Sequence, residues 1–214
     1  GCDKDELIGC KQFQFVQFHP SYDYTDFVEG LRPYQKEGSN DIGFKLEPGI
    51  FYSFCQDALE DKENKYVFVI DEINRGEISK IFGELFFSVE PSYRGPKGNV
   101  TTQFANLHKE ENEFDRMTTD NKRKRKGNFF VPENVFIIAT MNDIDRSVEN
   151  LDFAFRRRFP TEYIKWDDTL DSILETLNIS FKEEAKEALT RLNQAIAEEE
   201  ELGEDYTIGG AYLL

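Results

Sequence analysis

The sequence predicts an α/β fold in which helices flank a parallel sheet, with a small helical subdomain at the C-terminal end. Two apolar runs, residues 66–70 and 135–140, have the composition of strands that are buried on both faces, as the strands of parallel sheets are. Between these runs, apolar side chains recur from Ile78 to Val89 at the spacing of one helical face. These three patterns carry the prediction of the fold class.

The N-terminal part is predicted to contain one further strand and one further helix. Residues 13–18 mostly alternate in polarity, and Pro20 ends the strand because proline cannot donate to the ladder. Residues 32–41 are polar and contain glycine, which is typical of a loop. From Ile50 to Leu59 the apolar residues again fall on one helical face.

The middle of the chain is predicted to hold a helix and a long excursion. The helix is expected from Gly76 to Glu90. Residues 91–128 are polar, low in apolar content and include the basic run Lys122–Lys126. We expect an insertion or hairpin at about residues 91–128, with a mobile tip.

The C-terminal part changes character after a last predicted strand at residues 161–166. Helical patterns follow at residues 170–177 and 181–201. The expected domains are therefore an α/β core at residues 1–166 and a partial helical lid at residues 167–214.

Composition excludes several classes of protein. Of the 214 residues, 39% are hydrophobic and 32% charged, which is enough for a packed core. The balance of 26 basic and 42 acidic residues gives a net charge of −16, so free duplex DNA and anionic membranes are poor partners for the whole chain. No apolar run approaches the ~20 residues of a spanning helix. The 3 cysteines lack metal or redox spacing, and a cytoplasmic protein is expected.

The best candidate for chemistry is the acidic pair Asp71 and Glu72, which closes the first buried strand. Asn142 follows the second strand, and open parallel sheets bind ligands at the carboxyl ends of their strands. Mg²⁺ takes one or two carboxylates together with phosphate oxygens, and the neighbouring carboxylate can orient a water for attack on a phosphoryl group. The alternative is that this pair only caps the following helix.

Longer segments resemble motifs of the AAA+ NTPases, and more narrowly the McrB-type GTPase subunits of modification-dependent, 5-methylcytosine-specific restriction systems. Val67-Phe68-Val69-Ile70-Asp71-Glu72-Ile73-Asn74-Arg75-Gly76 resembles their Walker B segment. Further matches are the aromatic motif after the second strand (residues 18–30), the sensor-1 strand with the signature motif (130–147), the arginine-finger segment (151–159) and a weaker match near the end of the lid (206–212). The resemblance covers roughly residues 13–166. It implies an AAA+ P-loop-NTPase-like sheet.

The resemblance also implies roles for individual residues. Asp71 would hold the Mg²⁺ shell and Glu72 would polarise the attacking water. Asn142 would sense the terminal phosphate of GTP or ATP and help to position that water. Asp145 and Arg146 belong to the signature loop and would lie beside the bound nucleotide.

The arginine-finger segment implies that Arg157 and Arg158 reach the nucleotide of a neighbouring subunit, where an always-charged guanidinium stabilises the transition state. Arg156 is expected to be structural. The alternative for all three is a solvated run, or salt bridges within this acidic chain.

Other conspicuous residues are expected to be structural. His19 is expected to be a hydrogen-bonded turn residue, and Tyr22, Tyr24 and Phe27 are expected to pack rather than to stack on a base. Lys122–Lys126 reads first as a solvated tip. The alternative is that these lysines and arginines contact phosphates. In a ring, such an insertion could face the central channel.

One motif of the family is missing from these residues. Mg²⁺-dependent nucleotide binding in the family needs G-x-x-x-x-G-K-[ST], yet no glycine in this chain is followed by lysine. We therefore expect a fragment of a longer protein that lacks the Walker A strand; a degenerate homologue is the alternative. Because that strand is central in the AAA+ sheet, the fragment alone is expected to be rearranged, swapped or associated, and inactive.

Two functions from different classes remain. The first is a ring-forming motor, hexameric in the full-length protein, that hydrolyses GTP or ATP with Mg²⁺ and powers DNA translocation and cleavage by an McrC-like nuclease partner. DNA would bind through a separate domain, and no membrane is involved. Asp143 and Ile144 stand where McrB proteins usually have Thr-Ala, so GTP and ATP both stay open. The second is a non-catalytic AAA+-like assembly scaffold.

Overall fold

The computed structural model describes residues 9–36, 38, 40–118, 126–142, 153–176 and 181–213. The chain forms two compact units, Gly1–Phe159 and Pro160–Leu214. No helix within the described ranges is long and apolar enough to cross a membrane.

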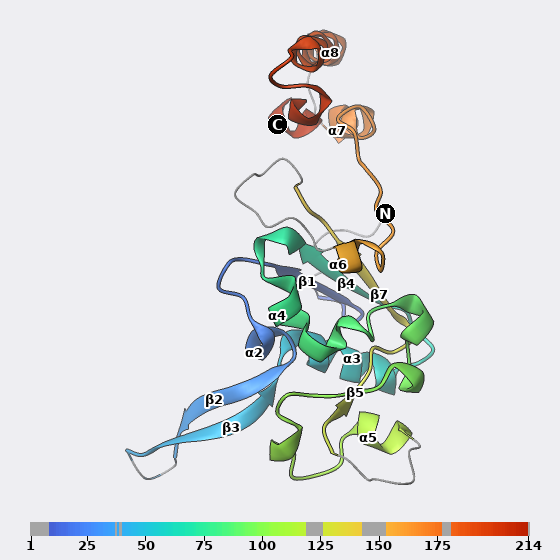
Figure 1. The fold of residues 1–214 in the computed structure, drawn as a ribbon. Coiled ribbons are helices and arrows are strands. Elements are labelled where there is room, and N and C mark those ends of the chain that lie inside the picture. The colour runs from blue at the N-terminus through green and yellow to red at the C-terminus, as the bar shows by residue number, and fades with distance from the viewer. Residues whose placement is uncertain are drawn as a thin grey trace. The chain divides into compact units, whose positions relative to one another are not determined.

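A three-stranded parallel sheet lies at the centre of the N-terminal unit (Figure 1). Its strands, in spatial order, are β1 (Phe13–Gln17), β4 (Tyr66–Asp71) and β7 (Val135–Ala139). The register pairs Gln17 with Asp71 and Ile70 with Ala139. The predicted α/β fold with a parallel sheet is confirmed, and all three strands end at the same edge.

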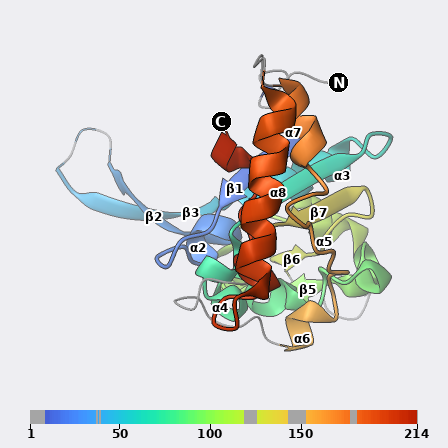
Figure 2. The ribbon, with the colours of Figure 1, turned by 90° about the horizontal axis from the view of Figure 1, so that it is seen from above.

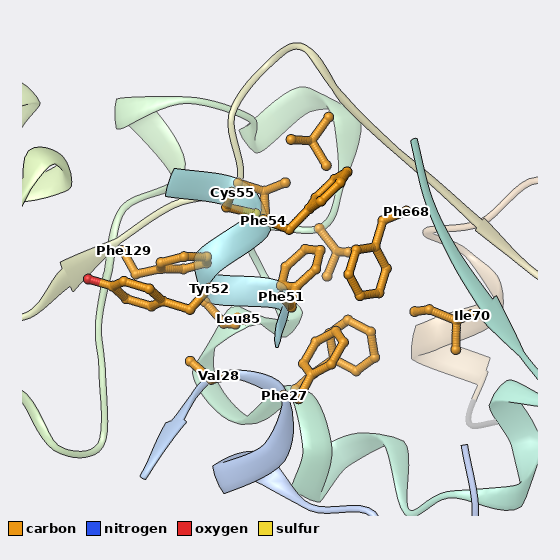
Figure 3. Packing of buried hydrophobic residues seen from close by; sticks show 14 of the residues in the cluster. Phe27, Val28, Phe51, Tyr52, Phe54, Cys55, Phe68, Ile70, Leu85 and Phe129 are labelled. Carbon is orange, nitrogen blue, oxygen red and sulfur yellow. The ribbon is translucent and has the colours of Figure 1, made fainter. Parts of the chain in front are cut away.

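One face of this sheet is buried under α3 (Ile50–Glu60), in the position that the sequence predicts for a helix. The rings of Phe51 and Phe54 lie 4.9 and 5.2 Å from the ring of Phe68 on β4 (Figure 3). Phe27 stacks on Phe51 with ring centroids 4.6 Å apart. Aromatic pairs of this kind contribute about 0.5–1.5 kcal/mol each beyond the area they bury, so the abundant phenylalanines form much of the core.

The opposite face of the sheet is only partly covered within the described residues. Phe15, Phe136 and Ile138 lie on it with 51%, 47% and 54% of their surface exposed. We call these three residues the open face. Strands of parallel sheets are ordinarily covered on both sides, so the described part of the chain supplies one of the two layers that such a sheet needs.

A β-hairpin occupies part of the range predicted as a loop: residues 32–35 are strand, whereas the described residues between Gln35 and Ile42 connect the two strands. After α2 (Tyr24–Phe27), β2 (Glu29–Gln35) pairs with β3 (Ile42–Pro48) in an antiparallel ribbon that extends away from the rest of the unit (Figures 1 and 2). The loop prediction was wrong at residues 32–35 because one face of the ribbon is polar: Arg32 lies opposite Lys45.

The predicted helix at residues 76–90 is interrupted. It begins as α4 (Ile78–Phe82), and the chain then continues as a 3₁₀ turn, Gly83–Phe86. Gly83 has φ +50°, a conformation that ends an α-helix, and Tyr24 lies where a Cβ at this glycine would point. The apolar spacing still places Ile81 and Leu85 in the core.

The insertion at residues 91–128 is partly built into the core. It contains β5 (Val100–Thr101), α5 (Glu113–Met117), β6 (Asn128–Phe129) and 3₁₀ turns at Pro91–Tyr93, Pro96–Gly98 and Ala105–Leu107. β5 and β6 pair antiparallel, and Phe114 and Phe129 are fully buried. Residues 119–125, which include most of the predicted tip, lie outside the described residues.

An ion pair fastens this insertion to the root of the hairpin. His108 Nε2 lies 2.8 Å from Oε2 of Glu29, the first residue of β2, and the Glu29 side chain is buried. The hydrogen bond to this carboxylate raises the pKa of His108 above its usual value, against the opposing effect of burial. The negative charge of Asp115 also raises the pKa of His108.

The C-terminal unit is helical, with α7 (Leu170–Thr176), α8 (Lys182–Glu198) and 3₁₀ turns at Glu204–Tyr206 and Gly210–Leu213. Leu170, Leu174 and Leu189 form its small core. The strand predicted at residues 161–166 is absent: residues 161–165 are irregular and a turn begins at Trp166. The assignment of residues 1–166 and 167–214 to a core and a lid stays a prediction.

Candidate active site

The Asp71 carboxylate is held by side chains from both neighbouring strands. Its Oδ1 accepts a hydrogen bond from Thr140 Oγ1 at 2.6 Å, and its Oδ2 accepts one from Gln17 Nε2 at 3.0 Å. Gln17 ends β1, Asp71 ends β4, and Thr140 directly follows β7. The carboxyl ends of all three strands therefore orient this one acidic group.

Glu72 leaves the sheet through a left-handed backbone conformation, with φ 51° and ψ 48°. Its N–H donates to Thr140 Oγ1 at 3.2 Å. Its Oε2 lies 2.8 Å from Arg75 Nε in an ion pair and accepts a hydrogen bond from Gln17 Nε2 at 3.4 Å. Gln17 therefore contacts both acidic side chains, and Glu72 lies beside Asp71 at the edge of the sheet.

The helix-cap alternative for the acidic pair is not met at Glu72. This residue precedes a 3₁₀ turn, Ile73–Arg75, but its side chain makes no capping hydrogen bond there. The helix α4 is preceded instead by Glu77.

Asn142 lies two residues beyond Thr140 and is tied to the segment that follows Glu72. The buried Asn74 donates from Nδ2 to the Asn142 carbonyl oxygen at 3.0 Å, and Ile73 N–H donates to the Thr140 carbonyl oxygen at 2.9 Å. The sequence-predicted residues Asp71, Glu72 and Asn142 are thus brought to one place. Asp145 and Arg146 lie outside the described residues.

The three arginines differ in environment. They lie at and after α6 (Phe153–Arg156), whose Phe155 is buried in the core. The Arg158 guanidinium lies 4.4 Å from the ring centroid of Phe86, with Nε 3.9 Å from Glu90 Oε2 and only 19% of the side chain exposed. Arg156 and Arg157 are exposed. Arg158 therefore packs against residues of its own chain, while Arg157 lies at the surface.

The residues expected to be structural behave as expected where they are described. The His19 ring accepts the Ser21 N–H through Nδ1 at 3.3 Å, and the His19 carbonyl accepts the Tyr22 N–H, which is a hydrogen-bonded turn. Tyr24 and Phe27 are buried in the core. Of the basic run only Lys126 is described, and its ammonium donates to the Lys109 carbonyl.

The donor set fits Mg²⁺ accompanied by a nucleotide better than a metal held by protein alone. Among the residues with described positions, no group of three or more His, Cys, Asp or Glu could hold a metal ion. Mg²⁺ needs no such group, because it keeps waters and takes phosphate oxygens beside one or two carboxylates. Asp71 and Glu72 supply those carboxylates at a half-exposed edge.

Sequence reasoning missed the residues that orient the acidic pair. Gln17, Asn74, Arg75 and Thr140 all contact the site, yet none was assigned a role. One signal was available: Gln17 and Thr140 are polar residues at the carboxyl ends of two predicted strands, and parallel strands that end together place such residues side by side.

Comparison with known families gives an independent result. Residues 5–159 match the model of the AAA domain (dynein-related subfamily), which is most of the chain.

Comparison with individual proteins gives two similar relatives. The chain is 38% identical over 210 residues to the Type IV methyl-directed restriction enzyme EcoKMcrB subunit of Escherichia coli (strain K12), covering 94% of this chain and 40% of that protein. It is 27% identical over 176 residues to the Type II restriction enzyme BsuMI component YdiS of Bacillus subtilis (strain 168), covering 72% of this chain and 48% of that protein. The chain therefore spans less than half the length of either relative.

Proposed function

Because the chain belongs to the dynein-related AAA domain family, we propose that it is part of a ring-forming motor that hydrolyses GTP or ATP. The observation that carries this proposal is the acidic pair at the carboxyl edge of the sheet, with Asp71 oriented by Gln17 and Thr140. Ligands of open parallel sheets bind at this edge. The similarity to two restriction-enzyme components supports a role in restriction, with hydrolysis driving a nuclease partner of the McrC type along DNA bound by another domain.

Each residue at the edge has a proposed task. Asp71 holds the hydration shell of Mg²⁺, and Glu72 orients and polarises the attacking water as a general base. Asn142 contacts the terminal phosphate, and Asp145 and Arg146 lie beside the nucleotide. When bound, Mg²⁺ would neutralise charge on the phosphates.

Between the two candidate arginine fingers, we assign the contact with a neighbouring subunit to Arg157. Arg157 is exposed, whereas the guanidinium of Arg158 packs on Phe86 and beside Glu90 in its own subunit. Because the guanidinium of Arg158, just after α6, packs against Phe86, it orients the neighbouring Arg157. Arg158 therefore supports the finger and does not itself leave the subunit.

Mixing two inactive variants tests the arginine assignment. Arg157→Ala and Glu72→Gln subunits should each fail to hydrolyse nucleotide alone, while a mixture should regain part of the activity. Some interfaces in a mixed ring join an intact Glu72 to an intact Arg157 from the neighbour. A mixture that stays inactive although mixed rings form would rule out action between subunits.

The proposed function itself is tested by phosphate release from GTP and from ATP, measured separately on the full-length protein. Glu72→Gln should lower turnover by roughly a hundredfold or more, because it removes the general base. Glu77→Gln is the matched control, since Glu77 is exposed and its carboxylate pairs with the exposed Lys80. Absence of turnover with nuclease partner and DNA present would favour the non-catalytic scaffold instead.

A further inference from the structure

The strained backbone of Glu72 is the starting point. Glu72 is the one non-glycine residue with positive φ among the described residues. A residue with a Cβ in the left-handed region costs of order 1–3 kcal/mol and persists where the surrounding structure holds it. Something at this edge must therefore fix the peptide groups on either side of Glu72.

Thr140 makes the contacts that fix them. Its hydroxyl oxygen accepts the Glu72 N–H at 3.2 Å, and its carbonyl oxygen accepts the Ile73 N–H at 2.9 Å. Its own N–H donates to the Ile70 carbonyl at 2.9 Å. Thr140, directly after β7, thus binds the backbone of Ile70, Glu72 and Ile73, where the chain leaves β4.

The hydroxyl of Thr140 also joins the two acidic residues in one chain of hydrogen bonds. A hydroxyl has one proton to donate and two lone pairs to accept with. Here the proton goes to Asp71 Oδ1 at 2.6 Å, and a lone pair receives the Glu72 N–H. The same oxygen therefore orients the carboxylate of Asp71 and the backbone of Glu72.

We propose that Thr140 is a positioning residue for nucleotide hydrolysis, which sets the Asp71 carboxylate and the Glu72 backbone in their working geometry. The inference rests on the proposed function and adds to it a residue that acts through two others. Groups that hydrogen-bond to metal-associated carboxylates typically change metal affinity or activity by 10–100-fold when they are removed.

The test compares Thr140→Val with Thr140→Ser in the full-length protein. Valine keeps the shape and removes the hydroxyl, whereas serine keeps the hydroxyl. Binding of a fluorescent N-methylanthraniloyl GTP or ATP is titrated with Mg²⁺, and kcat and KM are measured at saturating Mg²⁺. We expect valine to raise the half-saturating Mg²⁺ concentration about tenfold or more and to lower kcat to a similar extent. KM should change little, and serine should restore both quantities.

Controls separate positioning from folding. Thr190→Val removes a hydroxyl that donates to the Lys186 carbonyl within α8, and it should leave Mg²⁺ dependence and kcat unchanged. Thr140→Cys, which keeps a side chain of similar size with weak hydrogen-bonding ability, replaces valine if valine lowers the unfolding midpoint below the assay temperature.

The outcomes for Thr140 and for the proposed function are distinguishable. Folded valine or cysteine variants with wild-type Mg²⁺ dependence and wild-type kcat would overturn the role of Thr140 while the proposed function stands. A wild-type protein that binds the fluorescent nucleotide but turns over neither GTP nor ATP would overturn the proposed function. The Mg²⁺ titration would then still decide whether Thr140 orients the acidic edge.

Discussion

Removing the side chain of Asn134 should destabilise the N-terminal unit by an amount that its hydrogen bonds define. The Asn134 Nδ2 donates to the carbonyl oxygens of Ala58, Asp61 and Asn64 at 3.0, 3.1 and 2.8 Å. Ala58 lies in the last turn of α3, and Asp61 and Asn64 follow it; the last four carbonyls of a helix have no partner within the helix. The Asn134 amide, in the residue directly before β7, thus replaces that missing partner.

The magnitude follows from the two protons of the amide. Each intramolecular hydrogen bond contributes about 0.5–1.5 kcal/mol net, so Asn134→Ala should lower the free energy of unfolding by about 1–3 kcal/mol. Asn134→Asp should cost more than alanine. Its shape is nearly the same, but an ionised carboxylate has no proton to donate and would face the carbonyl oxygens of Ala58, Asp61 and Asn64.

Urea unfolding followed by far-ultraviolet circular dichroism measures this loss. The single tryptophan, Trp166, lies in the Pro160–Leu214 unit, so its fluorescence serves as an internal reference. Asn106→Ala, at an exposed asparagine, is the matched control. An aspartate variant as stable as the alanine variant, or either as stable as wild type, would refute the reasoning that donated protons hold this junction.

Two further predictions concern the root of the hairpin and the break in the predicted helix. Glu29 raises the pKa of His108 in the folded state. The pair therefore contributes its full stability below about pH 6.5, and this contribution is lost as pH rises through the folded-state pKa of His108. Over that range the free energy of unfolding should fall by at most about 1.4 kcal/mol per pH unit. In urea unfolding between about pH 6 and 9, His108→Gln should reduce the change of the free energy of unfolding with pH. His19→Gln, at an exposed histidine, is the control and should leave that change as in wild type. Equal pH dependence of stability in wild type and His108→Gln would contradict the assignment. Gly83→Ala should destabilise by about 1–2 kcal/mol in the same assay, because φ is +50° and the new Cβ would lie 3.1 Å from the Tyr24 ring; a neutral effect would show that the backbone there relaxes at no cost.

The parts of the fold that depend on apolar sequence alone were predictable. The run from Tyr66 to Ile70 is unbroken because β4 is the middle strand of a parallel sheet, and such a strand needs apolar side chains on both faces. The hairpin was missed because a two-stranded ribbon with a polar face resembles a loop in composition. Alternation along Ile42, Phe44 and Leu46 was the signal that identifies β3.

The break at Gly83 shows a different limit. Periodicity reports which side chains turn inward, and Ile81 and Leu85 do turn inward, but it carries no information about the backbone between them. Glycine within a helical pattern is the only sequence sign of such a break, and it is an ambiguous one.

The site was predictable where residues are neighbours in sequence and not where they meet through the sheet. Asp71 and Glu72 stand together in one motif, whereas Gln17 and Thr140 are separated from Asp71 by 54 and 69 positions. Their contacts depend on the order and register of three strands. That order places the end of β1 and the end of β7 on opposite sides of Asp71, which no local pattern specifies.

The open face can be covered in two ways that differ in kinetic order. Covering Phe15, Phe136 and Ile138 by another part of the same polypeptide is a first-order process, whose rate is independent of concentration. Association of two such faces from different molecules is second order. Each doubling of the protein concentration therefore doubles the rate of association relative to the rate of intramolecular covering. Cooling weakens the apolar attraction behind both. The yield of native molecules should therefore depend on dilution and temperature during synthesis and refolding, well before any nucleotide or partner is encountered.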